Sequence, residues 1–160
     1  MGSRDRAIIE VLYGCGIRVS ESISLKLSDI SEGFIKAKGK GDKQRIVPIG
    51  TKALDAIDDH LKYHKEGSLD LVFLSKNARV LDRVAVFRRI KKLAKEAGVN
   101  KTISPHTIRH SFATNILEKG ADLRLIQEFL GHVNIAVTDR YTHISAKRLK
   151  DSFTQFHPRP

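Results

Sequence analysis

Apolar side chains recur every three or four residues along most of this 160-residue chain, which is the spacing of an amphipathic helix. Between residues 4 and 13, for example, Ile8, Ile9 and Leu12 fall on one stripe. The pattern predicts helices over residues 4–13, 19–26, 51–65, 82–97, 105–119, 122–130, 134–143 and 146–156.

Capping residues support several of these boundaries. Ser104 suits a helix N-cap, and Pro105 suits the first helical position that follows it. Further expected caps are Thr51, Asp122 and Asn134 at helix starts and Gly98, Gly120 and Gly131 at helix ends.

Three short segments have the pattern of strands instead. Residues 34–38 and 44–49 predict a hairpin around the turn at 39–42, and residues 71–74 form a short apolar strand. The fold class expected from the chain is therefore α+β, mainly α-helical, with a small antiparallel β-sheet. Neither an internal repeat nor a low-complexity linker interrupts the chain, so we expect a single domain over 1–160.

The charge balance narrows the choice of partners. The chain has 29 Lys and Arg against 18 Asp and Glu, a formal net charge of +11. This excess favours a polyanion such as nucleic acid, although a basic protein with a solvated surface has the same composition. A membrane surface is a poorer fit, because no basic amphipathic helix with an aromatic face stands out.

Cysteine usage and the chain ends point to the cytoplasm. Cys15 is the single cysteine, it lies among apolar residues, and we expect a buried, unreactive thiol without disulfides. No run is apolar enough to cross a bilayer, and the first residues lack a secretory core. Residues 1–3 resemble a remnant of cloning.

Groups suited to a phosphate gather in the C-terminal third. His106 and Arg109 lie one turn apart on one face of the helix that Ser104 caps, near its N-terminus, where free N–H groups favour anions. His132 follows the helix-ending Gly131 and can project from a loop. Tyr141 is a plausible nucleophile, although a partly buried core tyrosine has the same pattern.

The N-terminal half adds further basic groups. Arg18 follows two glycines at a helix start, with Glu21 one turn later, and taken alone this is best explained as a surface ion pair. Lys40 lies in the hairpin turn, where it can reach a groove or remain an ordinary solvated turn residue. The rest of the hairpin is basic as well, and the predicted DNA-contacting residues are Lys36, Lys38, Lys43 and Arg45.

A metal site is not expected. His106 and His110 are four residues apart, as in a zinc-binding helix, but Thr107 stands where that motif has glutamate, and Arg109 would repel a cation. His110 is therefore interpreted as a structural, hydrogen-bonded histidine.

Taken together, the motifs resemble the tyrosine recombinase (phage integrase-type) family, in its XerC/XerD-like branch. The resemblance rests on Arg18 in Gly-Ile-Arg-Val-Ser-Glu, Lys40 in Gly-Lys-Gly-Asp-Lys-Gln-Arg-Ile-Val-Pro, the His106-x-x-Arg109 pair, Leu-Gly-His ending at His132, and Tyr141-Thr-His. It covers nearly the whole chain and implies the catalytic-domain fold of that family.

The resemblance also implies roles for these residues. Arg18 and Arg109 would bind the non-bridging oxygens of the scissile phosphate, with Glu21 supporting them. His106 would accept a proton, His132 would hydrogen-bond the transition state, and Lys40 would protonate the leaving 5′-oxygen. Tyr141 would attack to form a 3′-phosphotyrosine. No cofactor and no metal are implied.

At the level of the whole protein, the resemblance implies a C-terminal catalytic domain without the family's N-terminal core-binding domain. The partners would be double-stranded DNA and related protomers in a homo- or hetero-tetramer, and the tail at 146–160 would pack on its own core or dock on a neighbouring protomer. The branch serves chromosome partition at cell division by resolving chromosome or plasmid dimers. Integration or excision of a mobile element is the alternative.

Two alternatives come from other functional classes. One is a metal-free phosphodiesterase that uses water, and the other is a non-catalytic DNA-binding module.

Overall fold

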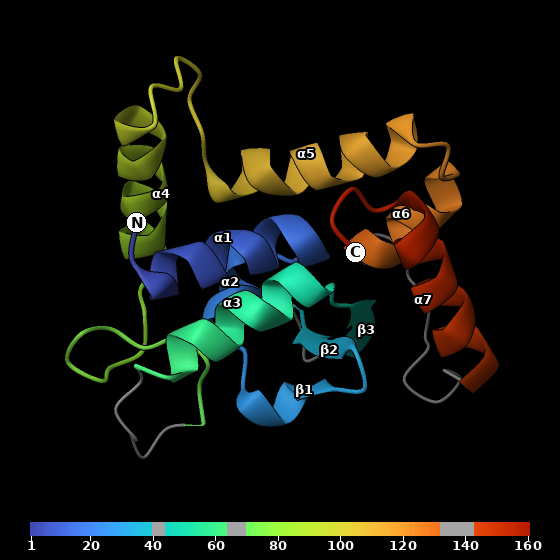
Figure 1. Ribbon diagram of the computed structural model, residues 1–160, viewed down its shortest axis with the longest axis horizontal. Coiled ribbons are helices and arrows are strands. Elements are labelled where there is room, and N and C mark those ends of the chain that lie inside the picture. The colour runs from blue at the N-terminus through green and yellow to red at the C-terminus, as the bar shows by residue number, and fades with distance from the viewer. Residues whose placement is uncertain (40–43, 64–69, 132–142) are drawn as a thin grey trace.

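The computed structural model describes residues 1–39, 44–63, 70–131 and 143–160 (Figure 1). In chain order the elements are α1 (Ser3–Cys15), α2 (Val19–Ile23), the 3-10 helix η1 (Leu27–Asp29), β1 (Ile30–Ser31), β2 (Phe34–Lys38), β3 (Gln44–Pro48), α3 (Thr51–Leu61), α4 (Arg83–Glu96), α5 (Pro105–Glu118), α6 (Leu123–Leu130) and α7 (His143–Phe156). The predicted mainly helical chain with a small sheet is what the structure shows.

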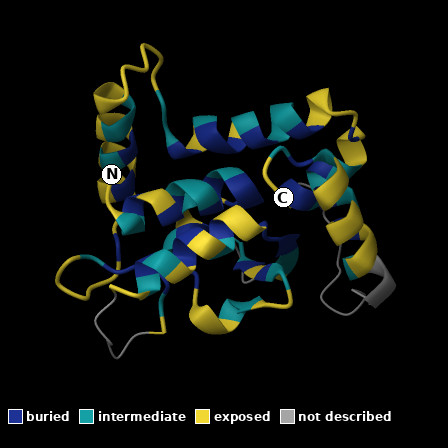
Figure 2. Ribbon diagram, viewed as in Figure 1, coloured by how far each residue is buried: buried dark blue, intermediate teal, exposed yellow. Residues whose placement is uncertain are grey.

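Helix α1 is central to the first half of the molecule. It packs between α5 and α3, with Ile8, Val11 and Leu12 buried in the main hydrophobic cluster (Figure 1). Figure 2 shows α1 largely buried or half-buried, whereas exposed residues dominate α4. Cys15, at the end of α1, is buried as expected, and burial raises the pKa of its thiol.

The predicted hairpin is confirmed, and an additional strand extends it. Strands β2 and β3 pair antiparallel with Ile35 opposite Val47 and Ala37 opposite Arg45, and β1 pairs on the other edge of β2. Ile35, Ala37 and Val47 are buried, so one face of the sheet packs on the core. The turn residues 40–43 lie outside the described part of the chain.

A second hydrophobic cluster holds the C-terminal helices together. It combines Phe112 and Ile116 of α5, Phe129 of α6, and Leu149 and Phe153 of α7, with the helices adjacent in Figure 1. The apolar side of α7 therefore packs on the chain's own core, the first of the two arrangements expected for the tail. Docking of this tail on a neighbouring protomer stays a prediction.

The residues after α7 return to the N-terminal half. The His157 ring stacks on Phe153 with centroids 4.5 Å apart, and burial lowers the pKa of His157 to about 4. Arg159 binds Glu10 of α1 over 2.7 Å, and Thr51 donates to the carbonyl of Pro160 over 2.9 Å. These contacts join the two hydrophobic clusters at the chain's end.

Several predicted boundaries are wrong. The helix expected at 19–26 ends at Ile23 and is followed by η1, and the helix expected to reach residue 65 ends at Leu61. Gly50, not Thr51, occupies the N-cap of α3. The strand expected at 71–74 does not form. Leu71 and Leu74 each make an isolated β-bridge, and no described strand pairs along the segment. The helix expected at 134–143 lies almost entirely outside the described residues.

Candidate active site

Arg18 occupies the turn between α1 and α2. Gly16 ends α1 in the left-handed conformation at φ 60°, and an ideal Cβ there would lie 2.4 Å from the Phe112 ring, so both backbone and packing require glycine. Arg18 is the N-cap of α2, and its backbone N–H donates to Glu21 Oε2 over 2.6 Å. Its guanidinium also donates to Glu21 Oε1 over 3.3 Å and stays 44% exposed.

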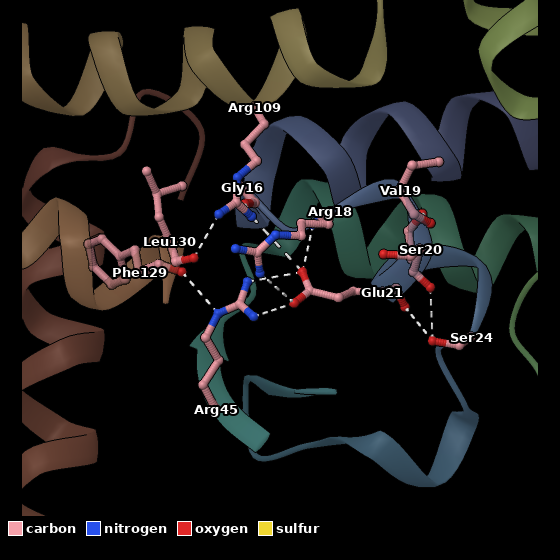
Figure 3. A network of polar contacts seen from close by, with 11 residues as sticks. Gly16, Arg18, Val19, Ser20, Glu21, Ser24, Arg45, Arg109, Phe129 and Leu130 are labelled. Carbon is pink, nitrogen blue, oxygen red and sulfur yellow. Dashed lines mark hydrogen bonds and ion pairs between the residues drawn. The ribbon is translucent and has the colours of Figure 1, made fainter. Parts of the chain in front are cut away.

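Glu21 is the centre of the polar network in Figure 3. Its side chain is 1% exposed, and it meets guanidinium groups from three separate elements: Arg18, Arg45 and Arg109. Burial alone would raise the pKa of Glu21, but hydrogen bonds and charges from Arg45 and Arg18 bring it below its ordinary value. The carboxylate is therefore ionised at neutral pH.

Arg109 is buried, and its guanidinium is hydrogen-bonded to two backbone carbonyls. Its side chain, 9% exposed, donates to the Gly16 carbonyl and to the Leu130 carbonyl, each over 2.6 Å, and lies 3.9 Å from Glu21 (Figure 3). Burial, followed by repulsion from Arg18 and Arg45, lowers the pKa of Arg109 to about 10. It remains a cation at neutral pH and connects the end of α1 to the end of α6.

Arg45 does not lie on the outer, DNA-facing side of the hairpin, where the basic composition of the hairpin suggested it would lie. It was expected to contact DNA from the basic hairpin, but its guanidinium binds both Glu21 oxygens, and Nε donates to the Phe129 carbonyl over 3.4 Å. Because side chains alternate across a strand, Arg45 shares the inner face with Val47 and lies opposite the buried Ala37.

Lys36 and Lys38 lie on the face of the hairpin opposite to that of Arg45. Lys36 is exposed on β2, and Lys38 is half-buried with its ammonium 3.9 Å from Asp29. Lys40 and Lys43 lie outside the described residues, as do His132 and Tyr141. The structure therefore brings together Arg18, Glu21 and Arg109 from the expected site, and adds Arg45 to them.

His106 lies on the same helix as Arg109 but in a different environment. The predicted helix start is confirmed: the Ser104 hydroxyl accepts from the Thr107 N–H over 3.1 Å, with Pro105 in the first turn. His106 is exposed, whereas Arg109 is buried. His110 is also exposed, so the expectation of a structural histidine was wrong.

The arrangement has the electrostatics of an oxyanion site. Three guanidinium groups around one carboxylate leave two positive charges uncompensated, and a phosphodiester carries one negative charge that the exposed fork of Arg18 can bind in bidentate geometry. Among the described residues, no group of three or more His, Cys, Asp or Glu side chains forms a metal site. No described helix is both long and apolar enough to cross a membrane.

Glu21 as a shared centre and Arg45 as its main partner were not recognised from sequence. The signal for Arg45 was available, because the alternation Arg45–Val47 places it on the core face of the strand. The pairing of Glu21 with Arg18 was expected, but its contacts with Arg45 and Arg109 have no local signal, because these two arginines come from separate parts of the chain.

Comparison with known proteins identifies the family. Residues 1–148 match the phage integrase family, and the chain belongs to it. It is 47% identical over 163 residues to the tyrosine recombinase XerD of Halalkalibacterium halodurans, covering 98% of this chain and 54% of that protein. It is 46% identical over 171 residues to XerD of Listeria monocytogenes, covering 99% and 56%.

Solved structures agree with this assignment. The XerA recombinase superposes with a TM-score of 0.77 at 38% identity, over 99% of this chain and 60% of that one. The XerH site-specific recombinase bound to difH substrate gives 0.72 at 30% identity, over 94% and 46%. The resemblance to XerC/XerD-like recombinases and the predicted fold class are thereby confirmed. The chain spans about half the length of the curated relatives it matches.

Proposed function

We propose that this chain is the catalytic part of a Xer-type, site-specific DNA recombinase that cleaves and rejoins strands through a 3′-phosphotyrosine. The observation that carries the proposal is the meeting of Arg18 and Arg109 on the buried carboxylate of Glu21. Their elements are far apart in sequence: Arg109 and its acceptor Gly16 are separated by 93 positions. Arg18 and Arg109 thus come from distant parts of the chain to one place, and the excess of positive charge there suits the binding of one phosphate group.

The phosphate would be bound mainly by the two arginines. The half-exposed Arg18 offers its free N–H groups to a non-bridging oxygen, while Glu21 fixes the plane of the fork. Arg109 supplies a cation that two carbonyls have already oriented, so little reorganisation is needed as charge develops. The cationic side chains would thus neutralise the phosphate without a metal or another cofactor, and we expect cleavage to persist in EDTA.

The reacting groups are assigned by motif. The Tyr141 oxygen attacks phosphorus, the bond from phosphorus to the 5′-oxygen breaks, and Lys40 gives that oxygen its proton. His106 takes the tyrosine proton, and its exposure at the start of α5 leaves the ring accessible to substrate. His132 donates to the transition state. Rejoining reverses these steps with a different 5′-hydroxyl, so the bond energy is kept in the phosphotyrosine.

The described end of α6 supports the assignment of His132. Gly131 ends α6 in the left-handed conformation, and Arg109 holds the preceding carbonyl. The backbone from which His132 follows is therefore fixed to the same guanidinium that we assign to the phosphate.

Binding of duplex DNA is supported by net charge and by the relatives. The exposed Lys36 and half-buried Lys38, with Lys43, are the expected phosphate contacts of the hairpin, and one structural relative is described as bound to difH substrate. We propose that the whole protein acts as a homo- or hetero-tetramer in the cytoplasm to resolve chromosome or plasmid dimers. The remaining half of such a protein would supply the core-binding domain.

A covalent-trapping assay tests the proposal. A nicked duplex from which the short fragment bearing the new 5′-hydroxyl dissociates after cleavage should accumulate a protein–DNA adduct with this chain, and the adduct should be absent with Tyr141→Phe at equal DNA affinity. If Tyr141→Phe still cleaves the DNA, water is the nucleophile and the chain is a phosphodiesterase. If neither protein cleaves but both bind, the chain is a DNA-binding module.

A further inference from the structure

We propose that Arg45 is a positioning residue that couples the Arg18–Glu21 pair to the C-terminal end of α6. This inference rests on the proposed recombinase function and assigns one more residue to its site. Arg45 lies on β3, an element to which none of the assigned reacting groups belongs, and its side chain crosses to two other elements (Figure 3).

Arg45 is too buried to be an ordinary charged residue of the protein surface. Its side chain is 11% exposed, whereas the Arg18 side chain beside it is 44% exposed. The pairing of Arg45 with Ala37 places it on the core face of the hairpin, opposite to the face that presents Lys36. A phosphate at the outer face of the hairpin would therefore meet Lys36 and not Arg45.

The contacts of Arg45 require a planar, forked group. Nη2 donates to Glu21 Oε2 over 3.0 Å, Nη1 binds Oε1, and Nε turns to the Phe129 carbonyl over 3.4 Å. Glu21 keeps its contacts with the backbone and guanidinium of Arg18 at the same time. A lysine at this position would keep the charge but could not bind the carboxylate and the carbonyl in this geometry.

The end of α6 is fitted to Arg45. An ideal Cβ on Gly131 would lie 2.7 Å from the Cδ of Arg45, so the glycine allows the arginine to pass directly over the backbone. Arg45 and Arg109 bind the consecutive carbonyls of Phe129 and Leu130, which a helix leaves without partners at its C-terminus. Arg45 therefore sets the orientation of Glu21 and the position of the backbone that leads to His132.

The test compares Arg45→Lys with Arg6→Lys, which makes the same substitution at an arginine whose exposed ion pair with Asp59 lies in a different part of the molecule. For each variant, DNA affinity, thermal unfolding and single-turnover cleavage of the trapping substrate at saturating DNA are measured. For Arg45→Lys we expect nearly unchanged affinity and a cleavage rate lowered about 100-fold, a loss that a displacement of about 1 Å at a reacting centre can cause. Arg6→Lys should match the wild-type chain in all three.

A wild-type cleavage rate for Arg45→Lys at saturating DNA overturns the inference, and weakened affinity beside that rate would identify Arg45 as a phosphate contact. If Arg45→Lys unfolds at the assay temperature, Arg45→Gln is measured instead, because Glu21 then keeps its contacts with Arg18 and Arg109. Arg45→Gln should fold and still show the rate loss, and a folded Arg45→Gln with the wild-type rate also overturns the inference. Absence of an adduct with the wild-type chain refutes the recombinase function itself, together with the inference that rests on it.

Discussion

The guanidinium of Arg109 donates to the carbonyl of Leu130 over 2.6 Å, so an arginine on α5 caps the C-terminus of α6. A cation at this end is favoured by the helix dipole and by the carbonyls that the helix leaves unpaired. Arg45 makes the neighbouring contact with Phe129. The last turn of α6 is therefore anchored to the same cluster that we assign to the phosphate.

Substitution of the glycine at this helix end tests the close approach. Gly131→Ala should destabilise the fold by more than Gly98→Ala. Both residues have positive φ, 67° and 71°, but only Gly131 has Arg45 at 2.7 Å from its ideal Cβ, whereas Gly98 has open space. The conformational strain common to both is about 1–2 kcal/mol. Urea unfolding measures the free-energy difference, and equal losses in the two variants would contradict the close approach of Arg45 to the helix end.

Loss of the central carboxylate should depend on pH. Glu21→Gln removes a buried ion pair, and we expect a loss of about 3 kcal/mol at pH 7. The pKa of Glu21 is lowered in the folded state, so the stability it contributes is present above its ordinary value of about 4.5 and is lost as pH falls through the folded pKa. The difference between wild type and Glu21→Gln should therefore shrink in acid.

Urea unfolding of both proteins between neutral pH and pH 3 checks this. His157, which is also titrated in that range, is common to both proteins and cancels from the difference. Asp59→Asn is the matched control, because the Asp59–Lys62 pair is exposed and should contribute little at any pH. If the difference in the free energy of unfolding between wild type and Glu21→Gln does not change with pH, the arginines do not lower the pKa of Glu21 in the folded state.

The packing of α7 has a direct consequence for stability. Phe153→Ala should lower the free energy of unfolding by about 3–5 kcal/mol, because this ring is buried against Phe129 in the chain's own core. Leu117→Ala, at an exposed position of α5, should change it by less than about 0.5 kcal/mol. Urea denaturation of the isolated chain measures both. A Phe153→Ala chain as stable as wild type would mean that α7 does not pack there in solution.

Local patterns predicted much of this fold. The hairpin, the ends of α4 to α6 and the caps Ser104 and Asp122 follow from side-chain alternation, helical spacing and short-range hydrogen bonds, all of which act within a few residues. The errors have long-range causes. Strand β1 was not predicted, because it has only two residues and is defined by its pairing with β2. Helix α2 is shorter than predicted, because the chain turns after it toward η1.

The candidate site was predictable only in part, because local patterns indicate residue types and spacing but not the contacts between distant elements. The types and spacing of Arg18, His106 and Arg109 indicated phosphate chemistry, and the family resemblance collected them. Burial of Glu21 among three arginines depends on how α2, β3 and α5 pack, which no local pattern encodes. Charge counting alone assigned Arg45 to the surface, although strand alternation placed it inside.

The most direct test of the central claim asks whether Arg18 neutralises the scissile phosphate. Arg18→Ala is compared with wild type on two trapping substrates, one with a normal phosphodiester and one with a neutral methylphosphonate at the cleavage position. On the phosphodiester, loss of one oriented donor should slow single-turnover cleavage about 100- to 1,000-fold. On the methylphosphonate, which lacks the charge that Arg18 would balance, the two proteins should cleave at similar rates. An equal defect on both substrates would contradict the assignment of the Arg18–Glu21–Arg109 cluster as the phosphate site.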